Sequence, residues 1–571
     1  MRTRPASLWL CVLLLVTLAA CDNAPAQPTQ QHVSSPLLGS YAATQPAPQN
    51  RSGTLVLADR QFPDAVNPLF SGSPVDFELQ AALWAAPVVF DNHFHAQPDQ
   101  LTEVPLPENG DVRDNGKTII MHLRHDLRWS DGQHILARDF QYWWRLDQNP
   151  DTGALNVNGY DQIASIETPD DFTVILHMKQ PYGPYLSFLP YAAPYHAWSH
   201  LRPIDLQNTS SVMLAPSVTN GPYKLASFTN GQSYTLAPNS NYRSTTFRGP
   251  FLAQLLFRAY SNIATLRAAI LAGQVDISED YMEYELPGLG RLSGPARLLE
   301  TPAAAYEHLD FNLSNANFQD VNVRRAISLA IDTCAITREV LHMPDCSRVT
   351  NQVEPPPSLY NDMTIAPHAY DLASARKLLT QAGWLPNARG ILTKQSKPFV
   401  IRLVTTADNP IRAAVATLIQ RDLQALGIQV QVQYYPLGPF FAVYGRGGIL
   451  ATGAFDLALF GYQNSAEPDD EYGVFHSSQI PTAAQPGLGN YGRIHDPIID
   501  QALTLGRDAV PFAQRVQDYH RFLAQLASQV YLIPLYTEIN IVTISDRTQN
   551  VLPNPDAIKN NWNIADWWVR A

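Results

Sequence analysis

The chain has 571 residues and a formal net charge of −12, so it is too long for one hydrophobic core and too acidic to favour nucleic acid or an anionic membrane surface as a partner. Hydrophobic residues make up 45% of the sequence. No apolar run beyond the first 21 residues is long enough to span a bilayer, so we expect two or three globular domains.

The first 21 residues have the pattern of an export signal. Arg2 and Arg4 give a positive start, an apolar stretch covers 8–18, and small residues precede Cys21. The sequence "LAAC" also resembles the bacterial lipobox, whose cysteine is lipidated and becomes the first mature residue. We therefore expect a lipoprotein signal peptide over 1–20 and a lipid anchor on Cys21; the alternative is an ordinary signal peptide with an incidental cysteine.

Residues 22–52 are rich in Pro, Gln, Ser and Ala and have little to bury. This composition predicts a disordered segment, so that 21–52 form a lipidated cysteine and its tether. A flexible chain of this length spans about 30 Å, enough to hold a folded body just outside a membrane.

The next part of the chain is predicted to consist mainly of strands. An alternating run covers 52–62, and 117–146 reads as strand, turn and helix. Another strand lies within 171–189. Two alternating runs in 219–242 flank Asn230-Gly231, a strong hairpin signal.

Helices become more frequent after about residue 260. The sequence predicts a helix ending at Gly273 and a long amphipathic helical region over 320–341. A helix over 371–384 follows. Both 409–437 and 515–545 read as a helix followed by strand. Alternation of helices with short strands indicates α/β architecture.

Several stretches in order resemble the extracytoplasmic solute-binding proteins of family 5, the peptide- and nickel-type, oligopeptide-binding-protein-like components of ABC importers. The matching stretches are "LRHDLRWSDGQHILARDF", "TNGPYKLASF", "LRAAILAGQVDI", "LDFNLSNANFQDVNVRRAISLAIDTCAI", "DLASARKLLTQAGW", "LQALGIQVQVQ", "GAFDLALFGYQNSAEPDDEYGVFHSS" and "YLIPLYTEI".

The resemblance implies a two-lobed α/β periplasmic-binding-protein fold of type II, with a hinge and a ligand cleft between the lobes. Lobe one, enlarged by an extra subdomain, would cover 53–303, with a C-terminal return over 539–571. Lobe two would cover 304–538. The chain would cross between lobes near 300–312 and return near 535–542, and a ligand would close the hinge.

The same resemblance implies where the ligand lies. Peptide-binding members hold an extended ligand whose main chain pairs with protein backbone like an added strand. Carried over, the cleft would be faced by 70–77, 305–308 and 460–475. The ligand-binding residues predicted from these stretches are Ser73, Val75, Tyr306, His308, Tyr462, Asn464, Glu467 and Asp469.

One departure from the family pattern concerns the ligand's ammonium group. Peptide-binding members place an aspartate a few residues after a Gly-aromatic pair; here Gly461-Tyr462 is followed by "QNSA", with no acid until Glu467. Either Glu467, Asp469 or Asp470 substitutes after a local shift, or the ligand has no α-amino group. Alternatively, "EPDDE" is a solvated acidic turn at a helix start, and Tyr462 is a packing residue.

Other candidate sites are weaker. Cys334 and Cys346 would form a disulfide in an exported chain, or remain two buried thiols. His93 and His95 form an H-x-H pair without a third ligand in view, so we expect a solvated loop there, no metal and no cofactor. The aromatic run 182–198 is expected to pack lobe one.

The sequence thus predicts a binding protein that captures peptides outside the cytoplasmic membrane and delivers them to an ABC permease and ATPase. It would act as a monomer, lipid-anchored to the outer face of that membrane, in the periplasmic space if an outer membrane exists. The motifs G-x-S-x-G, H-E-x-x-H and the phosphate-binding loop are absent. The alternatives are a non-peptide solute (nickel chelate, heme, sugar or opine), a ligand-sensing receptor, or an exported lipoprotein hydrolase.

Overall fold

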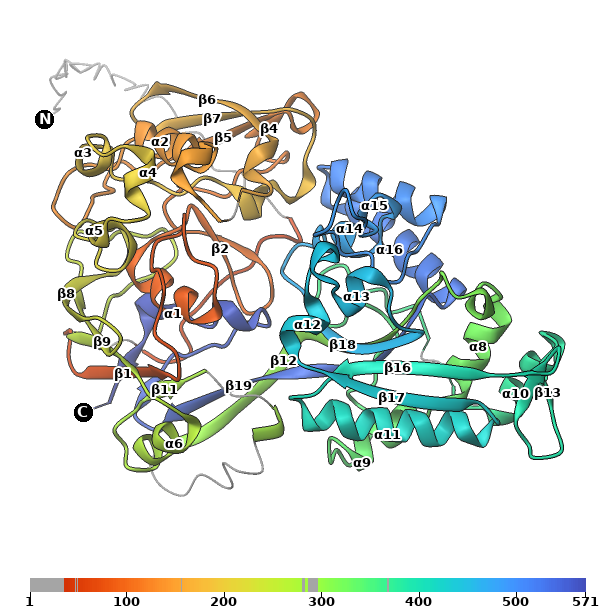
Figure 1. Cartoon of the computed structure of the whole chain (residues 1–571). Helices are drawn as coiled ribbons and strands as arrows, with labels where there is room; N and C mark the ends of the chain where they lie inside the picture. Colours follow the sequence, from red (N-terminus) through yellow and green to blue (C-terminus); the bar gives the residue numbers. More distant parts are fainter. Residues whose placement is uncertain are drawn as a thin grey trace, which may run out of the picture. The chain divides into compact units, whose positions relative to one another are not determined.

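The structure is a computed structural model that describes residues 35–46, 48, 50–155, 157–279, 283–285, 296–366 and 369–570 (Figure 1). The predicted signal peptide and Cys21 lie outside the described residues. From Ser35 onward the chain forms one compact unit. We keep the names lobe one (53–303 with 539–571) and lobe two (304–538) for the predicted segments, whose boundaries stay predictions.

The largest sheet in the described part of the chain has ten strands, in the order β17-β16-β18-β12-β19-β11-β1-β10-β9-β8. Its strands are β1 (Thr54–Asp59), β8 (Tyr223–Thr229), β9 (Ser233–Pro238), β10 (Gln254–Ala259), β11 (Ile277–Ser278), β12 (Ala296–Phe311), β16 (Val400–Thr406), β17 (Gln429–Tyr435), β18 (Leu457–Gln463) and β19 (Leu532–Ser545).

Two long antiparallel strands, β12 and β19, connect the two ends of this sheet. Residues 305–311 of β12 pair with β18, whereas residues 543–544 of β19 pair with β11. The pairing register between β12 and β19 shifts between Pro302 and Tyr306. The predicted crossing (300–312) and return (535–542) therefore fall on the two strands that join both ends of the sheet.

A parallel strand–helix–strand unit forms one end of the sheet. Helix α11 (Pro410–Ala425) starts at Asn409, whose side chain accepts a hydrogen bond from the Arg412 amide, and it connects the parallel strands β16 and β17. At Gly427 the backbone has φ 93°, and a Cβ atom there would lie 2.2 Å from a carbonyl oxygen, so only glycine fits this helix end. The predicted helix and strand over 409–437 are confirmed.

The predicted helical region 320–341 forms two helices rather than one. Helix α8 (Val321–Ala330) is capped by Asp320, and α9 (Thr333–Glu339) by Asp332. Asp332 competes for backbone amides as a second N-cap, which breaks the periodic pattern. The other longer helices of lobe two are α10 (Leu372–Gln381), α15 (Pro497–Asp508) and α16 (Phe512–Gln529), with short α12 (Leu437–Phe441), α13 (Ile449–Thr452) and α14 (Asp470–Phe475).

Lobe one adds a four-stranded sheet of order β4-β5-β7-β6. These strands are β4 (Val112–Arg113), β5 (Thr118–His122), β6 (Ile163–Asp170) and β7 (Thr173–Met178). Its helices are α1 (Pro74–Leu83), α2 (Ala137–Asp147), α3 (Tyr195–Trp198), α4 (Pro203–Leu206), α5 (Ser210–Met213) and α6 (Ile263–Leu271). The predicted hairpin is confirmed: β8 and β9 pair around Gly231, which has φ 72°.

Smaller elements complete the described chain. The remaining strands are β2 (Val88–Phe90), β3 (Ala96–Pro98), β13 (Leu385–Pro386), β14 (Leu392–Lys394), β15 (Lys397–Pro398), β20 (Thr548–Gln549) and β21 (Trp568–Val569). Short 3₁₀ turns include η4 (Gly183–Phe188), η6 (Ala316–Phe318) and η9 (Ala557–Lys559). Within the described residues, no helix is both long and apolar enough to cross a bilayer.

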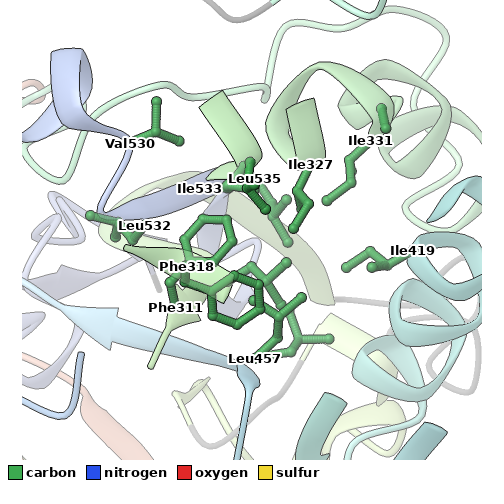
Figure 2. Close-up of a cluster of buried hydrophobic side chains, with 14 of the residues drawn as sticks. Phe311, Phe318, Ile327, Ile331, Ile419, Leu457, Val530, Leu532, Ile533 and Leu535 are labelled. Atoms are coloured by element: carbon green, nitrogen blue, oxygen red, sulfur yellow. The ribbon is translucent and has the colours of Figure 1, made fainter. Parts of the chain in front are cut away.

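A large hydrophobic core fills lobe two (Figure 2). It brings side chains from β12, α8, α11, β18 and β19 together, and many of them are fully buried. Its central residues include Phe311, Phe318, Ile327, Ile419, Leu457 and Leu535. Close packing of this kind fixes the strands that carry the predicted site.

The start of the described chain corrects the prediction of a disordered tether. Leu37 is buried, and the Tyr41 hydroxyl donates to Asp566 at 3.0 Å. The Tyr41 ring packs edge-on against Phe247 and Trp562. The prediction is therefore wrong for 35–46, because two apolar anchors suffice to bind a segment whose average composition is polar.

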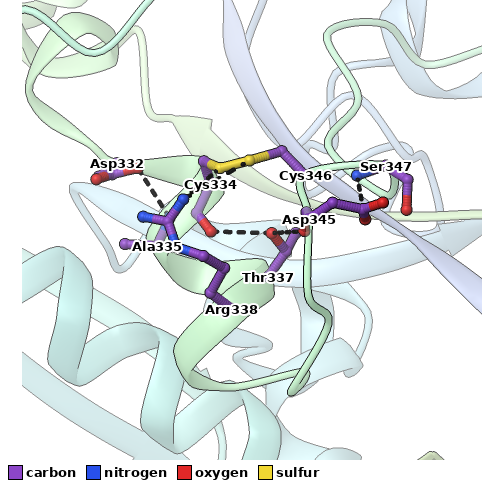
Figure 3. The surroundings of a disulfide bond; sticks show 8 residues. All are labelled: Asp332, Cys334, Ala335, Thr337, Arg338, Asp345, Cys346 and Ser347. Atoms are coloured by element: carbon purple, nitrogen blue, oxygen red, sulfur yellow. Dashed lines mark hydrogen bonds between the residues drawn. A yellow bond between two sulfur atoms is a disulfide. The ribbon is translucent and has the colours of Figure 1, made fainter.

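A disulfide joins Cys334, at the start of α9, to Cys346 (Figure 3). The two Cα atoms are 5.1 Å apart, within the usual range for a cystine. Arg338 lies against it, with Nη1 2.8 Å from the Cys334 sulfur. The bridge closes a short loop on lobe two.

Candidate ligand-binding site

Strand pairing brings two of the predicted cleft segments together. In the register of β12 with β18, Ala305 lies opposite Gln463 and Tyr306 opposite Tyr462. The Asn464 amide continues the ladder by donating to the Ala304 carbonyl at 2.6 Å. The two segments that the resemblance assigned to lobe two are therefore one continuous patch of sheet.

The aromatic residues of this patch point into lobe two. Tyr306 and His308 are fully buried, and the His308 ring stacks on Tyr462 with centroids 5.0 Å apart. The hydroxyls of Tyr306 and Tyr462 are buried without a hydrogen-bond partner among the described residues. The structure thus gives Tyr462 a packing role, and ligand contact by Tyr306 or His308 would require them to move.

Asn464 also turns inward. Its side-chain amide donates to the Val353 carbonyl at 2.6 Å and to Glu354 Oε1 at 3.3 Å, and the residue is buried. These bonds hold the chain as it leaves β18. Contact between Asn464 and a ligand stays a prediction.

Glu467 forms a buried ion pair with Arg515 on α16. Arg515 Nη2 lies 2.5 Å from Glu467 Oε2, and the side chains are 1% and 5% exposed. Burial raises the pKa of Glu467, and Arg515 opposes this shift. The expectation of a solvated acidic turn is therefore wrong for Glu467, because a charge at this depth needs a paired cation.

Asp469 is committed to two other groups. Its carboxylate accepts hydrogen bonds from Nε and Nη2 of Arg507, at 2.7 and 2.9 Å, and from the hydroxyl of Tyr182 at 3.0 Å. Tyr182 comes from lobe one, just before η4. Asp469 therefore joins the two lobes in this structure, with little hydrogen-bonding capacity left for a ligand.

Asp470 differs from both neighbours. It is exposed, and its carboxylate accepts one hydrogen bond, from the Ser465 hydroxyl at 3.2 Å. No Lys or Arg in the described residues forms an ion pair with it. Burial by surrounding groups, with Asp469 adding, raises its pKa to about 6, against which Lys559 acts. Of the carboxylates at 467, 469 and 470, this one is available to a cation.

Behind Asp470 lie two more carboxyl groups that the sequence did not single out together. Glu354 and Glu471 are almost fully buried, and Glu354 also accepts from Ser358 Oγ at 2.5 Å. Burial raises the pKa of Glu354 to about 8, with Asp470 adding to the shift. Burial also raises the pKa of Glu471 well above its ordinary value, with Glu354 and Asp470 adding. At neutral pH the pair retains a proton.

The predicted lobe-one residues lie at the start of α1. Ser73 precedes the helix and Asp76 accepts from its amide at 2.9 Å, while Val75 is buried. One turn further on, Gln80 donates to the Tyr191 hydroxyl at 3.4 Å. Helix α1 packs against η9, which ends at Lys559.

The H-x-H pair of the sequence, His93 and His95, lies in an irregular segment before β3. In the described ranges, no three His, Cys, Asp or Glu side chains are placed to hold an ion. His93 and His95 stack 6.1 Å apart, and His95 lies 3.7 Å from Asp91. The H-x-H pair therefore lies in a local turn next to Asp91.

The ten-stranded sheet, with β12 and β19 joining its two ends, carries the predicted site residues at and after the end of β18. The model of the bacterial extracellular solute-binding proteins, family 5 (middle), matches residues 102–480, and the chain belongs to this family. Its members bind solutes and are not catalysts. The predicted family, the absence of enzymatic activity and the extracytoplasmic class are confirmed at this level.

Similar proteins agree with this assignment. The oligopeptide-binding protein AppA of Bacillus subtilis (strain 168) is 23% identical over 584 residues, covering 100% of this chain and 99% of AppA. The structure of B. subtilis AppA with a nonapeptide matches with a TM-score of 0.67 at 21% identity, covering 91% of this chain and 100% of AppA.

A second solved structure shows the same fold with another ligand. NikZ from Campylobacter jejuni, in complex with Ni(L-His), matches with a TM-score of 0.71 at 22% identity, covering 90% of this chain and 99% of NikZ. The α/β periplasmic-binding-protein fold is confirmed by these matches. They leave the class of solute open, because the same fold holds a nonapeptide in one and a nickel complex in the other.

Proposed function

We propose that this protein captures peptides outside the cytoplasmic membrane and delivers them to an ABC permease driven by a separate ATPase. The observation that carries this proposal is Asp470, the exposed carboxylate that follows the β12–β18 patch. It would pair with the α-ammonium group of the peptide in place of the aspartate missing after Gly461-Tyr462.

The neighbouring acids support this choice by exclusion. Glu467 is paired with Arg515, and Asp469 is bound by Arg507 and Tyr182. A ligand would therefore have to displace an arginine to reach either carboxylate. Asp470 needs no such exchange. A cation brought to it would form a charge-assisted hydrogen bond that this carboxylate lacks in the described structure.

We expect the peptide main chain to lie beside this carboxylate. β18 ends at Gln463, which is exposed, and Asp470 follows seven residues later. The similarity to AppA, which is named an oligopeptide-binding protein, supports the choice of a peptide as the solute. The predicted lipid anchor on Cys21 would keep the protein close to its permease.

Asp470→Asn tests the proposal. We expect native mass spectrometry of the full-length protein to detect co-purified peptides, and calorimetry with these peptides to show at least tenfold weaker binding by the variant, about 1.4 kcal/mol. Since Asp470 ionises with a pKa of about 6, wild-type affinity should also fall as the pH drops below about 6.

The matched control is Asp151→Asn, which removes an equal charge from an exposed site on lobe one. It should bind as the wild type does. Recovery of a nickel chelate, heme, sugar or opine in place of peptides would refute the proposal, as would unchanged peptide affinity in the folded Asp470→Asn variant.

A further inference from the structure

Lobe one touches lobe two at a place that involves neither of the crossing strands β12 and β19. Tyr182, just before η4, donates its hydroxyl hydrogen to Asp469 Oδ2 at 3.0 Å. Arg507, near the end of α15, donates to the same carboxylate at 2.7 and 2.9 Å. Lobe two itself therefore holds the acceptor in place for Tyr182, and a hydrogen bond to a charged acceptor is stronger than one between neutral groups.

The next residue, Gly183, brings its backbone directly against lobe two. Gly183 is buried, and a Cβ atom there would lie 2.3 Å from the Ala509 carbonyl oxygen and 2.5 Å from Arg515 Nε. Its φ angle is not positive, so its own backbone conformation is open to other residues. Glycine is therefore needed at this position because of the neighbouring lobe and not because of the turn.

The part of lobe two that meets Gly183 is held in place by its own contacts. Arg515 has a side chain that is 1% exposed, and it pairs with Glu467 and donates from Nε to the Gly506 carbonyl at 3.2 Å. Ala509 follows α15, and its amide donates to the Leu505 carbonyl at 2.8 Å. Since neither group can move aside without losing these bonds, an added methyl group at Gly183 would push the lobes apart.

Another contact between the lobes lies beside the crossing strands instead. Arg348 of lobe two donates to the Thr537 carbonyl on β19 at 2.8 Å and pairs with Glu283 of lobe one. Hinge motion concentrates its backbone changes in a few residues and moves the rest of each domain as a rigid body. A contact on the hinge strand can therefore persist when the lobes separate, whereas the contact of Tyr182 and Gly183 has to break.

We propose that Tyr182 and Gly183 form a latch that holds lobe one against lobe two in the absence of a solute. The latch sets the ratio of closed to open molecules, and with it the share of the protein that is open to take up a solute. This inference goes beyond the proposed function, because it applies to a peptide and to any other solute alike.

The test measures the distance between the lobes without a ligand. Full-length protein is freed of co-purified ligand, checked by native mass spectrometry, and carries spin labels on keto amino acids at the exposed positions 108 and 504, one on each lobe. Double electron–electron resonance should show mainly a short distance for the wild type. Gly183→Ala should replace it by a longer one, and Tyr182→Phe should lower the ratio of closed to open molecules about tenfold.

Two control variants separate the latch from a general disturbance. Gly487→Ala adds a methyl group that meets no described atom within 4 Å beyond its chain neighbours, and Tyr195→Phe removes the hydroxyl of an exposed tyrosine on lobe one. Both should keep the wild-type distances, and circular dichroism should show that every variant is folded.

Three results would overturn the inference: wild-type distances in folded Gly183→Ala, an unchanged ratio in Tyr182→Phe, or a wild type that is mainly open without ligand. If Gly183→Ala does not fold, the ratio measured for Tyr182→Phe decides. Because no ligand is present, failure of the latch leaves the proposed function standing, and failure of peptide binding leaves the latch standing.

Discussion

Glu467 and Asp470 stand three residues apart in one acidic turn, yet their surroundings are opposite. Glu467 is buried and held by Arg515 at 2.5 Å, while Asp470 is exposed and accepts only a serine hydroxyl. One carboxylate belongs to the interior of lobe two and the other to its surface. The difference shows that the charge pattern of a segment does not reveal which charges serve the fold and which can serve a ligand.

The buried surroundings of Glu467 contain other polar side chains besides Arg515. Tyr360 packs against Arg515 and lies within 3.5 Å of Glu467, and Glu354 and Glu471 lie nearby, all buried. Charges at this depth are tolerated only when each is paired or protonated. We therefore expect substitutions there to change stability, and substitutions of Asp470 to change binding.

The largest expected effect comes from breaking the interior pair. Arg515→Met leaves Glu467 buried without its cation, and we expect the free energy of unfolding to fall by about 3–5 kcal/mol. Urea unfolding followed by circular dichroism measures this loss. Arg507→Met is the matched control: its partner Asp469 lies in a more exposed pair, with the arginine 31% accessible, so a loss of about 1 kcal/mol is expected. Equal losses of stability in both variants would show that the buried pair stabilises the fold no more than the exposed pair does.

A smaller effect should come from the buried acid pair. The pKa of Glu354 is raised from 4.5 to about 8, chiefly by burial, with Asp470 and Glu467 adding to the shift, and Glu471 facing it. A raised carboxyl pKa means that the folded state holds a proton the unfolded state releases. The contribution of Glu354 to the free energy of unfolding is therefore greatest below about pH 4.5, and it decreases as the pH rises toward about 8.

Glu354→Gln should remove this dependence, because an amide stays neutral at every pH. A pKa change of one corresponds to ~1.4 kcal/mol, so between pH 5 and pH 8 the wild type should lose at least that much more stability than the variant. Urea midpoints at pH 5, 6.5 and 8 provide the comparison. Parallel curves for the two proteins would show that Glu354 is ionised in the folded chain throughout.

The sequence predicted the fold well because its signals are local. Gly427 ends a helix, Asn230-Gly231 makes a hairpin, and alternating runs make strands; each needs only a few neighbouring residues. Local signals failed at 320–341, where Asp332 starts a second helix, and at 35–46, where Tyr41 anchors to Trp562 from the far end of the chain.

The candidate site was harder to predict because it depends on partners distant in sequence. Nothing near Glu467 shows that Arg515 will neutralise it, and nothing near Asp469 points to Tyr182. The resemblance pointed to the segment 460–475, but the sequence could not show which acid in it is exposed.

The smallest expected change in stability is that of Asp470→Asn. Asp470→Asn should change the free energy of unfolding by no more than about 0.5 kcal/mol, because the side chain is exposed and its one hydrogen bond, from the Ser465 hydroxyl, can also be accepted by the asparagine Oδ1. Removing a carboxylate beside Asp469 also relieves repulsion, so a slight gain in stability would fit. If the variant folds normally but binds peptides tenfold more weakly, Asp470 contributes to binding and not to the stability of the fold. A loss of several kcal/mol would instead place Asp470 with Glu467 among the carboxylates that the fold requires.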